Sequence, residues 1–316
     1  MTNIKSILKI VLPLLLGIVL VWFSFSKISF SELLVYFKNA NYAWIILGVG
    51  LGLLSHLSRA YRWKFMLEPL GYDIKFRNSI MAVFSTYLIN YTIPRAGEVA
   101  RASILTNYEG VPFEKGFGTI VAERLADMLV LVVIIGITLF LEFEFIYDYL
   151  FSKFDVIKIL IGLILFLSFL TIIIIYVKKS SSKIAQRVKA FFNGLVDGML
   201  SIFKMKKKWP FIAHTIFIWV MYVLMFYVTT FAVPELNNIP FAAVLVGFIS
   251  ASFSIAATNG GIGSYPVAVY LAFSIFGVAE DPSIAFGWII WTSQTLMVVI
   301  LGGLSLIYLP IFNRQR

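Results

Sequence analysis

Residues 87–127 read YLINYTIPRAGEVARASILTNYEGVPFEKGFGTIVAERLAD, and this stretch concentrates charge between apolar segments. Pro94 and Gly97 stand close together where the apolar run 78–93 ends. Proline lacks a backbone donor and glycine permits unusual dihedral angles, so the pair predicts a break between two helices. Six ionisable side chains of the stretch lie beside or inside apolar helices: Arg95, Glu98, Arg101, Glu123, Arg124 and Asp127.

The composition around this stretch is that of an integral membrane protein. The chain has 316 residues, of which 60% are hydrophobic and 13% charged, whereas a soluble domain carries about 25% charged residues. Several runs reach the roughly 20 apolar residues that cross a hydrocarbon core. An ionisable group at membrane depth costs about 2.5–3.5 kcal/mol even on a lenient scale. The charged stretch therefore needs internal partners, and it is where we expect the functional site.

The residue inventory excludes several kinds of chemistry. The chain has no cysteine and two histidines, which excludes disulfides, thiolate metal sites and an H-E-x-x-H motif. No Walker-type G-x-x-x-x-G-K-[ST] sequence occurs. We therefore expect no catalytic residue, no metal and no cofactor. The net charge of +10 is explained by cytoplasmic loops and anionic lipid headgroups rather than by nucleic acid.

Hydrophobic periodicity predicts an all-α polytopic fold with roughly 7–9 hydrophobic helices. The expected helices are 7–25, 42–60, 78–93, 119–141, 157–177, 211–232, 241–257, 265–278 and 284–309. We expect one integral-membrane domain over 1–316, with a first half 1–177, a basic loop 178–209 and a second half 210–316. Two of the helices, 78–93 and 265–278, are too short for a comfortable span.

Loop charges predict the orientation in the cytoplasmic (inner) membrane. The loop 178–209 holds nine lysines and arginines against one acid, and 59–77 holds five against two. Both should be cytoplasmic, as should the N- and C-termini, whereas the acid-rich segment 142–155 should lie outside. We interpret Arg59, Arg62, Trp63 and Lys64, which follow the helix 42–60, mainly as an interfacial anchor.

These assignments require an odd number of crossings between 59–77 and 142–155. The segment 78–93 is then expected to enter and return on the cytoplasmic side, and 119–141 to span. The second half contains a similar interruption at 258–266, which reads TNGGIGSYP. Interrupted segments at corresponding places of two halves mark the binding site of many transporters. An inverted repeat is a hypothesis that rests on this layout alone.

The two interruptions carry a resemblance to a known family. The motif that begins at Asn90 and continues as Pro94-Arg95-x-Gly97-Glu98-x-x-Arg101 precedes Glu123-Arg124-x-x-Asp127 and then Gly260-Gly261-Ile262-Gly263. In this order the motifs resemble the transmembrane region of lysylphosphatidylglycerol synthases, also called the flippase-like domain family. The resemblance implies a domain that moves or accommodates phospholipids or lipid-linked molecules.

Two departures from the family pattern bear on what is carried over. The soluble domain that attaches the amino acid in bifunctional members is not expected here, since six residues follow Pro310 and the longest loop is short. Many members have an acidic or amide residue a few positions after the glycines, where this chain has Ser264-Tyr265-Pro266. The resemblance therefore implies the translocation function and leaves the role of that position open.

The charged candidate residues can be interpreted either as a lipid-phosphate site or as a structural network. Arg95 and Arg101 would hold a lipid phosphate in bidentate forks, and Glu98 and Asp127 would orient them. The alternative is a buried ion network that pins the broken helix. For Glu123 and Asp127, which lie on one helical face with Arg124 three residues before Asp127, counter-charge for the arginines is the first interpretation, and proton transfer is the second.

The second interruption would line the other wall of the cavity. Gly260, Gly261 and Gly263 would present backbone N–H groups to an anion, or form a plain tight turn. Asn259 would cap a helix and add a polar lining.

The favoured function is translocation of a phospholipid or polyprenyl-phosphate-type lipid across the membrane. One alternative is a membrane-embedded lipid-modifying transferase with Glu123 or Asp127 as the base. The other is a non-transporting partner of a lipid synthase. An oligomer is compatible with the sequence.

Overall fold

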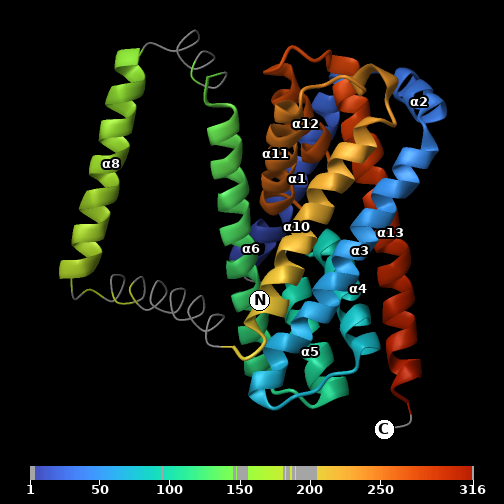
Figure 1. The fold of residues 1–316 in the computed structure, drawn as a ribbon, viewed down its shortest axis with the longest axis vertical. Coiled ribbons are helices and arrows are strands. Elements are labelled where there is room, and N and C mark those ends of the chain that lie inside the picture. Colours follow the sequence, from blue (N-terminus) through green and yellow to red (C-terminus); the bar gives the residue numbers. More distant parts are fainter. Residues whose placement is uncertain are drawn as a thin grey trace. The chain divides into compact units, whose positions relative to one another are not determined.

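A computed structural model describes residues 4–93, 95–144, 156–180 and 205–314, together with 147, 182, 186 and 189. In these ranges the chain is helical, with eleven α-helices, two short 3₁₀ helices and no strand, which confirms the all-α prediction. The chain divides into two compact units (Figure 1). The first comprises residues 1–123 and 207–316, and the second comprises 124–206.

The helices of the first unit are α1 (Ile4–Lys27), α2 (Phe30–Asn39), α3 (Tyr42–Leu67), α4 (Phe76–Thr92), α5 (Ala96–Glu109), α10 (Lys208–Thr230), α11 (Phe241–Ala257), α12 (Ser264–Ser274) and α13 (Glu280–Phe312). Helix α6 (Phe113–Leu141) begins in the first unit and continues into the second, which also holds α8 (Val156–Lys179). Two 3₁₀ helices, η1 (Glu68–Leu70) and η2 (Pro234–Leu236), complete the described elements.

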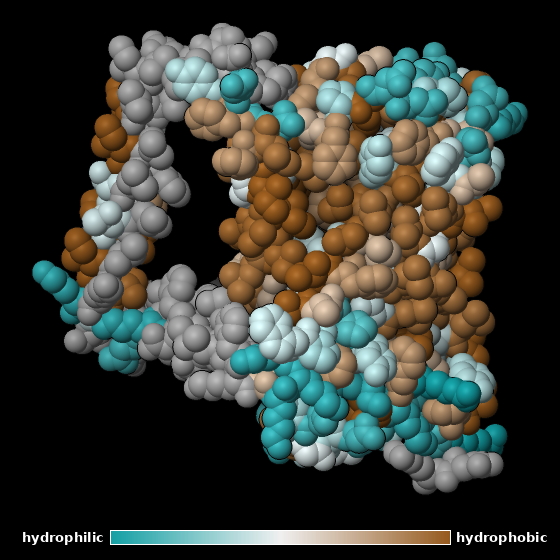
Figure 2. Space-filling model, in the orientation of Figure 1, coloured by the Kyte–Doolittle hydropathy of each residue, from teal (hydrophilic) through white to brown (hydrophobic). Residues whose placement is uncertain are grey.

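Length and hydropathy identify the membrane-spanning candidates. Four stretches qualify in the described part of the chain: Tyr42–Leu70, Phe113–Leu141, Lys208–Thr230 and Glu280–Phe312. A fifth qualifies if α1 and α2, which meet at 81°, form one broken span. Figure 2 shows a hydrophobic surface over the middle of the first unit and hydrophilic residues at the ends of its helices. The protein is thus a multi-pass membrane protein, as predicted.

The first interruption forms an antiparallel helical hairpin. Helix α4 ends at Thr92 and α5 begins at Ala96, around the proline at position 94. The far ends of the two helices meet again, because the Glu109 carboxylate accepts from the backbone N–H of Lys75 (3.2 Å) and from the amide of Asn78. Near the bend, Gly97 lies so close to the Thr86 carbonyl that a Cβ at position 97 would collide with it.

The second interruption forms a hairpin of the same kind. Helix α11 ends at Ala257 and α12 begins at Ser264. Gly260, Gly261 and Gly263 take φ values of 64°, 82° and 68° in the connection. These left-handed conformations explain why three glycines stand here. At the other end of the hairpin, Gly247 of α11 faces the ring of Phe273 in α12.

The two hairpins approach the middle of α13 from opposite ends. The base of the α4–α5 hairpin joins the C-terminal end of α13 through hydrogen bonds between Asn78 and Asn313 (2.9 and 3.0 Å). The other hairpin packs on the N-terminal half of α13, where Gly287 meets Pro266. Figure 1 shows α11 and α12 towards one end of the first unit, and α4 and α5 towards the other.

The hairpin tips touch. The ring of Tyr91, in the last turn of α4, lies directly on Gly260 in the second interruption. Both tips are tied to α13, because the Trp291 indole donates to the Gly260 carbonyl (2.8 Å) and the Tyr91 hydroxyl bonds Thr295 (3.1 Å).

The structure differs from the predictions at α3 and α2, and it leaves two predicted loops largely undescribed. The helix expected over 42–60 runs to Leu67, so the interpretation of Arg59, Arg62 and Trp63 as an interfacial anchor is wrong: all three are buried. Helix α2 was not expected, although Ser29 and Glu32 form a capping box at its start. Most of the loop 178–209 and of the acid-rich segment 142–155 lies outside the described residues.

Candidate functional site

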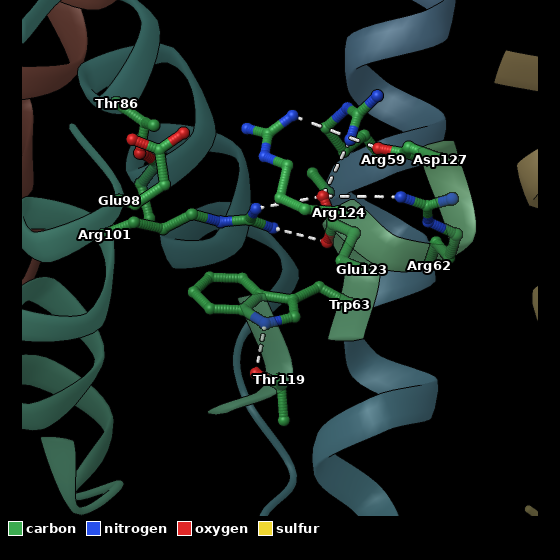
Figure 3. A network of polar contacts seen from close by, with 12 residues as sticks. Arg59, Arg62, Trp63, Thr86, Glu98, Arg101, Thr119, Glu123, Arg124 and Asp127 are labelled. Atoms are coloured by element: carbon green, nitrogen blue, oxygen red, sulfur yellow. Dashed lines mark hydrogen bonds and ion pairs between the residues drawn. The ribbon is translucent and has the colours of Figure 1, made fainter. Parts of the chain in front are cut away.

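The carboxylate of Glu123 lies at the centre of the site, where three arginine side chains contact it (Figure 3). Arg59 donates to Oε1 at 2.8 Å, and Arg62 approaches the same oxygen at 3.4 Å. Arg101 presents both terminal nitrogens, one to Oε1 at 3.1 Å and the other to Oε2 at 3.2 Å. The last contact is the bidentate fork in which a guanidinium best matches a carboxylate.

All four side chains are removed from the surface: Arg59 is 3% exposed, Arg62 0%, Arg101 1% and Glu123 0%. Arg59 and Arg62 are three residues apart on α3, so they share one face of that helix. Arg101 comes from α5 and Glu123 from the first part of α6. The cluster therefore fastens three helices of the first unit to one another.

Aromatic and hydroxyl groups complete the surroundings. The guanidinium of Arg101 lies 3.8 Å from the ring centroid of Trp63, within the range of a cation–π contact. The indole of Trp63 donates to Thr119 at 2.9 Å. Arg62 donates to the hydroxyl of Thr215 in α10 at 2.8 Å. These contacts fix the orientations of the arginines.

Acidic and basic side chains alternate around this cluster. Three guanidiniums share the carboxylate of Glu123. Glu98 precedes Arg101 by three residues on α5, and Figure 3 shows the two side chains on the same side of that helix.

Asn90 ties the end of α4 to the start of α5. Its side-chain carbonyl accepts from the backbone N–H of Gly97 at 2.8 Å, and its amide reaches both carboxylate oxygens of Glu98 at 3.3 and 3.5 Å. A helix start has unpaired N–H groups that need such acceptors. Asn90, Gly97 and Glu98, which lie on either side of the break, therefore form one hydrogen-bonded group.

Arg95 differs from the other arginines. It is exposed, it precedes α5, and its φ is 62°, the left-handed conformation that costs a non-glycine residue about 1–2 kcal/mol. It forms no ion pair with any residue that the structure describes. Strained residues cluster at functional sites. Arg95 thus combines strain, exposure and a charge that the described residues do not neutralise.

Arg124 and Asp127 belong to the second unit. They face each other one turn apart on α6, with 3.9 Å between the guanidinium and the carboxylate, and Asp127 is buried. In the structure Asp127 therefore has Arg124 of its own helix as a partner, and the expected orientation of Arg95 and Arg101 by Asp127 stays a prediction.

The glycine-rich connection brings the remaining candidates together. Gly260 contacts Tyr91 of the other hairpin, and Gly263 packs on the backbone of Gly17 in α1. Asn259 is buried, and it accepts a backbone hydrogen bond from Ile262 at 3.4 Å. The two halves of the predicted site thus meet at the hairpin tips.

Sequence reasoning missed Arg59 and Arg62 as partners of Glu123, and it missed Tyr91 and Trp291 at the tips. A signal for the first pair was present: Ser55, His56, Ser58, Arg59 and Arg62 fall at helical spacing and extend the 42–60 helix as a polar stripe. Nothing in the sequence pattern distinguishes Tyr91 or Trp291 from the many aromatic residues of the chain.

Comparisons with known proteins give one matching family model and two similar proteins. The family model described as the lysylphosphatidylglycerol synthase TM region matches residues 10–303. The UPF0104 membrane protein MJ1595 of Methanocaldococcus jannaschii is 26% identical over 90% of this chain and 89% of its own length. The glycosyltransferase AglD of Haloferax volcanii is 28% identical over 110 residues, which are 34% of this chain and 18% of that protein. The chain belongs to the family of the lysylphosphatidylglycerol synthase transmembrane region, and it is similar to it along nearly its whole length.

Proposed function

We propose that this protein moves a phospholipid or a lipid-linked phosphate across the cytoplasmic membrane, with both termini on the cytoplasmic side. The lipid phosphate binds beside the tip of the α4–α5 hairpin. The observation that carries the proposal is the position of Arg95, an exposed and strained cation at the hairpin tip without an ion pair among the described residues.

The roles of the charged residues follow from their burial. Arg95 contacts the phosphate, because its guanidinium is accessible and forks to phosphate oxygens. Arg101, held by both oxygens of Glu123, positions α5. Asn90 and Glu98 fix the start of α5 and so the place of Arg95. In the second unit, Asp127 and Arg124 orient each other.

The opposed hairpins support the transport mechanism. Both are re-entrant in this proposal: each enters the membrane from one side and returns to it, and their tips meet near the midplane. Broken backbone is tolerated at that depth only where protein or water covers it. Related halves of this kind place the substrate site at their interface. A single integral-membrane domain of 1–316 would then work as two halves around the tips.

The translocation either is passive or uses an ion gradient, since no Walker-type nucleotide motif occurs in the sequence.

Fluorescent-phospholipid scrambling in proteoliposomes tests the proposal. Wild-type protein should move an anionic phospholipid, and Arg95→Ala should reduce the rate about tenfold or more, because one charge-assisted contact to phosphate contributes about 1.5–3 kcal/mol. Arg314→Ala removes the same charge from an exposed position at the end of α13 and should leave the rate unchanged.

Arg95→Gly separates charge from backbone strain. Glycine takes a φ of 62° freely, so this variant keeps the loop conformation and loses only the guanidinium. If its rate equals that of wild type, the phosphate role of Arg95 is refuted. No movement of any lipid by the wild-type protein would refute translocation itself.

One observation favours a second candidate, in which this chain works beside a separate lipid-modifying enzyme. The local similarity to a protein named as a glycosyltransferase suggests a membrane segment that serves a transferase. Such a partner should co-purify with the intact protein from its native membrane, and scrambling should then be absent.

Glu123→Gln and Asp127→Asn distinguish a third case, a transferase within this chain, because they would abolish product formation while lipid movement persists in part.

A further inference from the structure

A cluster of buried hydroxyl groups lies at the break between α11 and α12. Ser254 and Thr258 stand one turn apart at the end of α11, and Ser264 is the first residue of α12. The hydroxyl oxygens of Thr258 and Ser264 are 2.7 Å apart, and those of Ser254 and Ser264 are 3.1 Å apart. The Ser254 carbonyl oxygen lies 2.8 Å from the Thr258 hydroxyl and 3.5 Å from the Ser264 hydroxyl. These four oxygen atoms form one compact group, the oxygen cluster, on residues that are at most 8% exposed.

The oxygen cluster has more lone pairs than hydrogen atoms. Each hydroxyl has one proton and two lone pairs, whereas a carbonyl has lone pairs only. The three hydroxyls can donate one hydrogen bond each, and the Ser254 carbonyl also accepts from the Thr258 backbone N–H at 3.1 Å. Acceptor capacity is therefore left over on buried atoms, and buried polar groups cost free energy unless they are paired. A cation would use the remaining lone pairs.

Two further features of the same break favour a cation. The end of a helix carries the partial negative charge of its last carbonyl groups, and α11 ends at Ala257. Asn259, which follows Thr258 directly, is 2% exposed, and neither its Oδ1 nor its Nδ2 has a hydrogen-bond partner among the residues that the structure describes. Buried polar atoms are almost always paired, so this amide calls for an explanation.

The absence of charge in this hairpin limits which cation fits. Residues 241–279 contain no Asp, Glu, Lys, Arg or His. Calcium and magnesium are bound largely by carboxylates, and no group of three or more His, Cys, Asp or Glu residues in the described part of the chain could hold a metal ion. Neutral oxygens at the broken helices of transporters bind monovalent ions instead.

We infer that the break between α11 and α12 binds one sodium ion, with the oxygen cluster and the side-chain carbonyl of Asn259 as ligands. Sodium is the smaller of the two abundant alkali cations, and the oxygens of the cluster are only 2.7–3.5 Å from one another. Potassium would have to spread these oxygens further apart. The ion site itself does not depend on lipid movement.

The position of the site connects it with the tips of the two hairpins. The ring of Tyr91 covers Gly260, which follows Asn259 in sequence. The carbonyl of Gly260 also accepts from Trp291. An ion held by Thr258 and Asn259 therefore stabilises the conformation of the connection on which Tyr91 packs. A sodium gradient would then drive lipid past the tips, and this consequence alone rests on the proposed function.

Thermal unfolding of the lipid-free full chain in detergent tests the inference. Sodium chloride replaces choline chloride at constant ionic strength, and the melting temperature of the wild-type protein should rise until the site is saturated. Potassium chloride should need a concentration about tenfold higher, or more, for the same shift. Binding of radioactive sodium to the same protein should saturate at one ion per chain.

Thr258→Val and Thr258→Ser form a matched pair of variants. Valine keeps the shape of threonine without its oxygen, so the sodium concentration at half of the temperature shift should rise about tenfold. Serine keeps the oxygen and should retain the wild-type value. Ser252→Ala, the control on the same helix, removes a hydroxyl that donates to the Phe248 carbonyl at 2.8 Å, and it should leave sodium binding unchanged.

Two results would overturn the inference. The first is a wild-type melting temperature that responds equally to sodium, potassium and choline, with no radioactive sodium bound. The second is wild-type sodium affinity in Thr258→Val, since the hydroxyl would then serve only the fold. Each half-saturation concentration is read within one variant, so a change in baseline stability does not imitate a loss of binding.

The same measurements separate the ion site from the proposed function. Sodium binding by a wild-type protein that moves no lipid would refute translocation and leave the ion site standing. Lipid movement by a protein that binds no sodium would refute the ion site and leave translocation standing as a passive process.

Discussion

Glu123 is the residue on which the charged site depends. Its carboxylate receives guanidinium groups from two helices, α3 and α5, inside a part of the protein where water does not reach it. Desolvating several ions is expensive, and mutual attraction with additional hydrogen bonds must offset that cost. The bidentate contact of Arg101 and the hydroxyl partner of Arg62 provide such bonds. Removing the carboxylate would take away the acceptor that three buried cations share.

Glu123→Gln is therefore expected to lower the free energy of unfolding by about 3–5 kcal/mol, the cost of breaking a buried ion pair from one side. Denaturant unfolding in detergent micelles measures the loss. In Glu123→Gln/Arg101→Gln the cation that made the bidentate contact is also removed, so the double variant should lose less than the sum of the two single losses, by about 0.5–3 kcal/mol.

The control for this pair is Glu235→Gln, which removes an exposed carboxylate of the same unit. Its effect should stay within about 0.5 kcal/mol. Strict additivity of Glu123→Gln and Arg101→Gln would contradict the coupling described above.

At the scale of elements, the two broken hairpins are specified by their connections. Proline interrupts the first and glycines at positive φ shape the second, yet both give antiparallel pairs of short helices. The close packing at Gly97 and Gly247 shows why a side chain is absent at each of these helix–helix contacts. The tips then meet because Tyr91 of one hairpin packs on Gly260 of the other.

Gly260→Ala should damage this contact in two ways. Alanine is strained at a φ of 64°, by about 1–2 kcal/mol, and its Cβ would collide with the Tyr91 ring. Adding Tyr91→Ala should remove the collision but not the backbone strain, so the double variant should recover part of the melting temperature lost in Gly260→Ala.

Gly50→Ala is the matched substitution. Gly50 lies inside α3 with open space around its Cα, so alanine should stabilise the protein by about 0.5–1 kcal/mol. A loss in Gly260→Ala that Tyr91→Ala does not reduce at all would argue against tip-to-tip packing.

At the scale of the whole molecule, the distribution of charge along the chain determines the expected orientation. Lys75 and Arg314 lie at the end of the first unit where α4 begins and α13 finishes. Glu235, Glu280 and Asp281 lie at the other end, around an open cavity of about 610 Å³. Basic residues stay in the cytoplasm, so the C-terminal end of α13 is predicted to face it.

The absence of cysteine makes this prediction easy to check. Single cysteines at the exposed positions Lys75, Asn107 and Arg314 should react with a membrane-impermeant maleimide only from the cytoplasmic side. Cysteines at Glu235 and Asp281 should react only from outside. Labelling of Asn107→Cys from the side opposite to Lys75→Cys would mean that the α4–α5 pair crosses the membrane instead of re-entering it.

Sequence patterns predicted the positions of several helices closely. The helix expected over 241–257 is confirmed with identical bounds, and those expected over 78–93 and 157–177 are displaced by one or two residues. Long apolar runs between polar segments leave few alternatives. The boundary error mattered in one place: extending 42–60 to Leu67 placed Arg59, Arg62 and Trp63 inside the protein.

The amino-acid sequence by itself determined the membrane class, the family motifs, both helix breaks and the charged residues between them, because hydropathy, proline and glycine act locally on the backbone. Only the tertiary structure decided which charges share a partner and which polar groups have none. Arg59 and Arg62 reach Glu123 across more than 60 positions of sequence, and Tyr91 reaches Gly260 across more than 160. Such contacts depend on how helices pack against one another, which no local pattern of residues encodes.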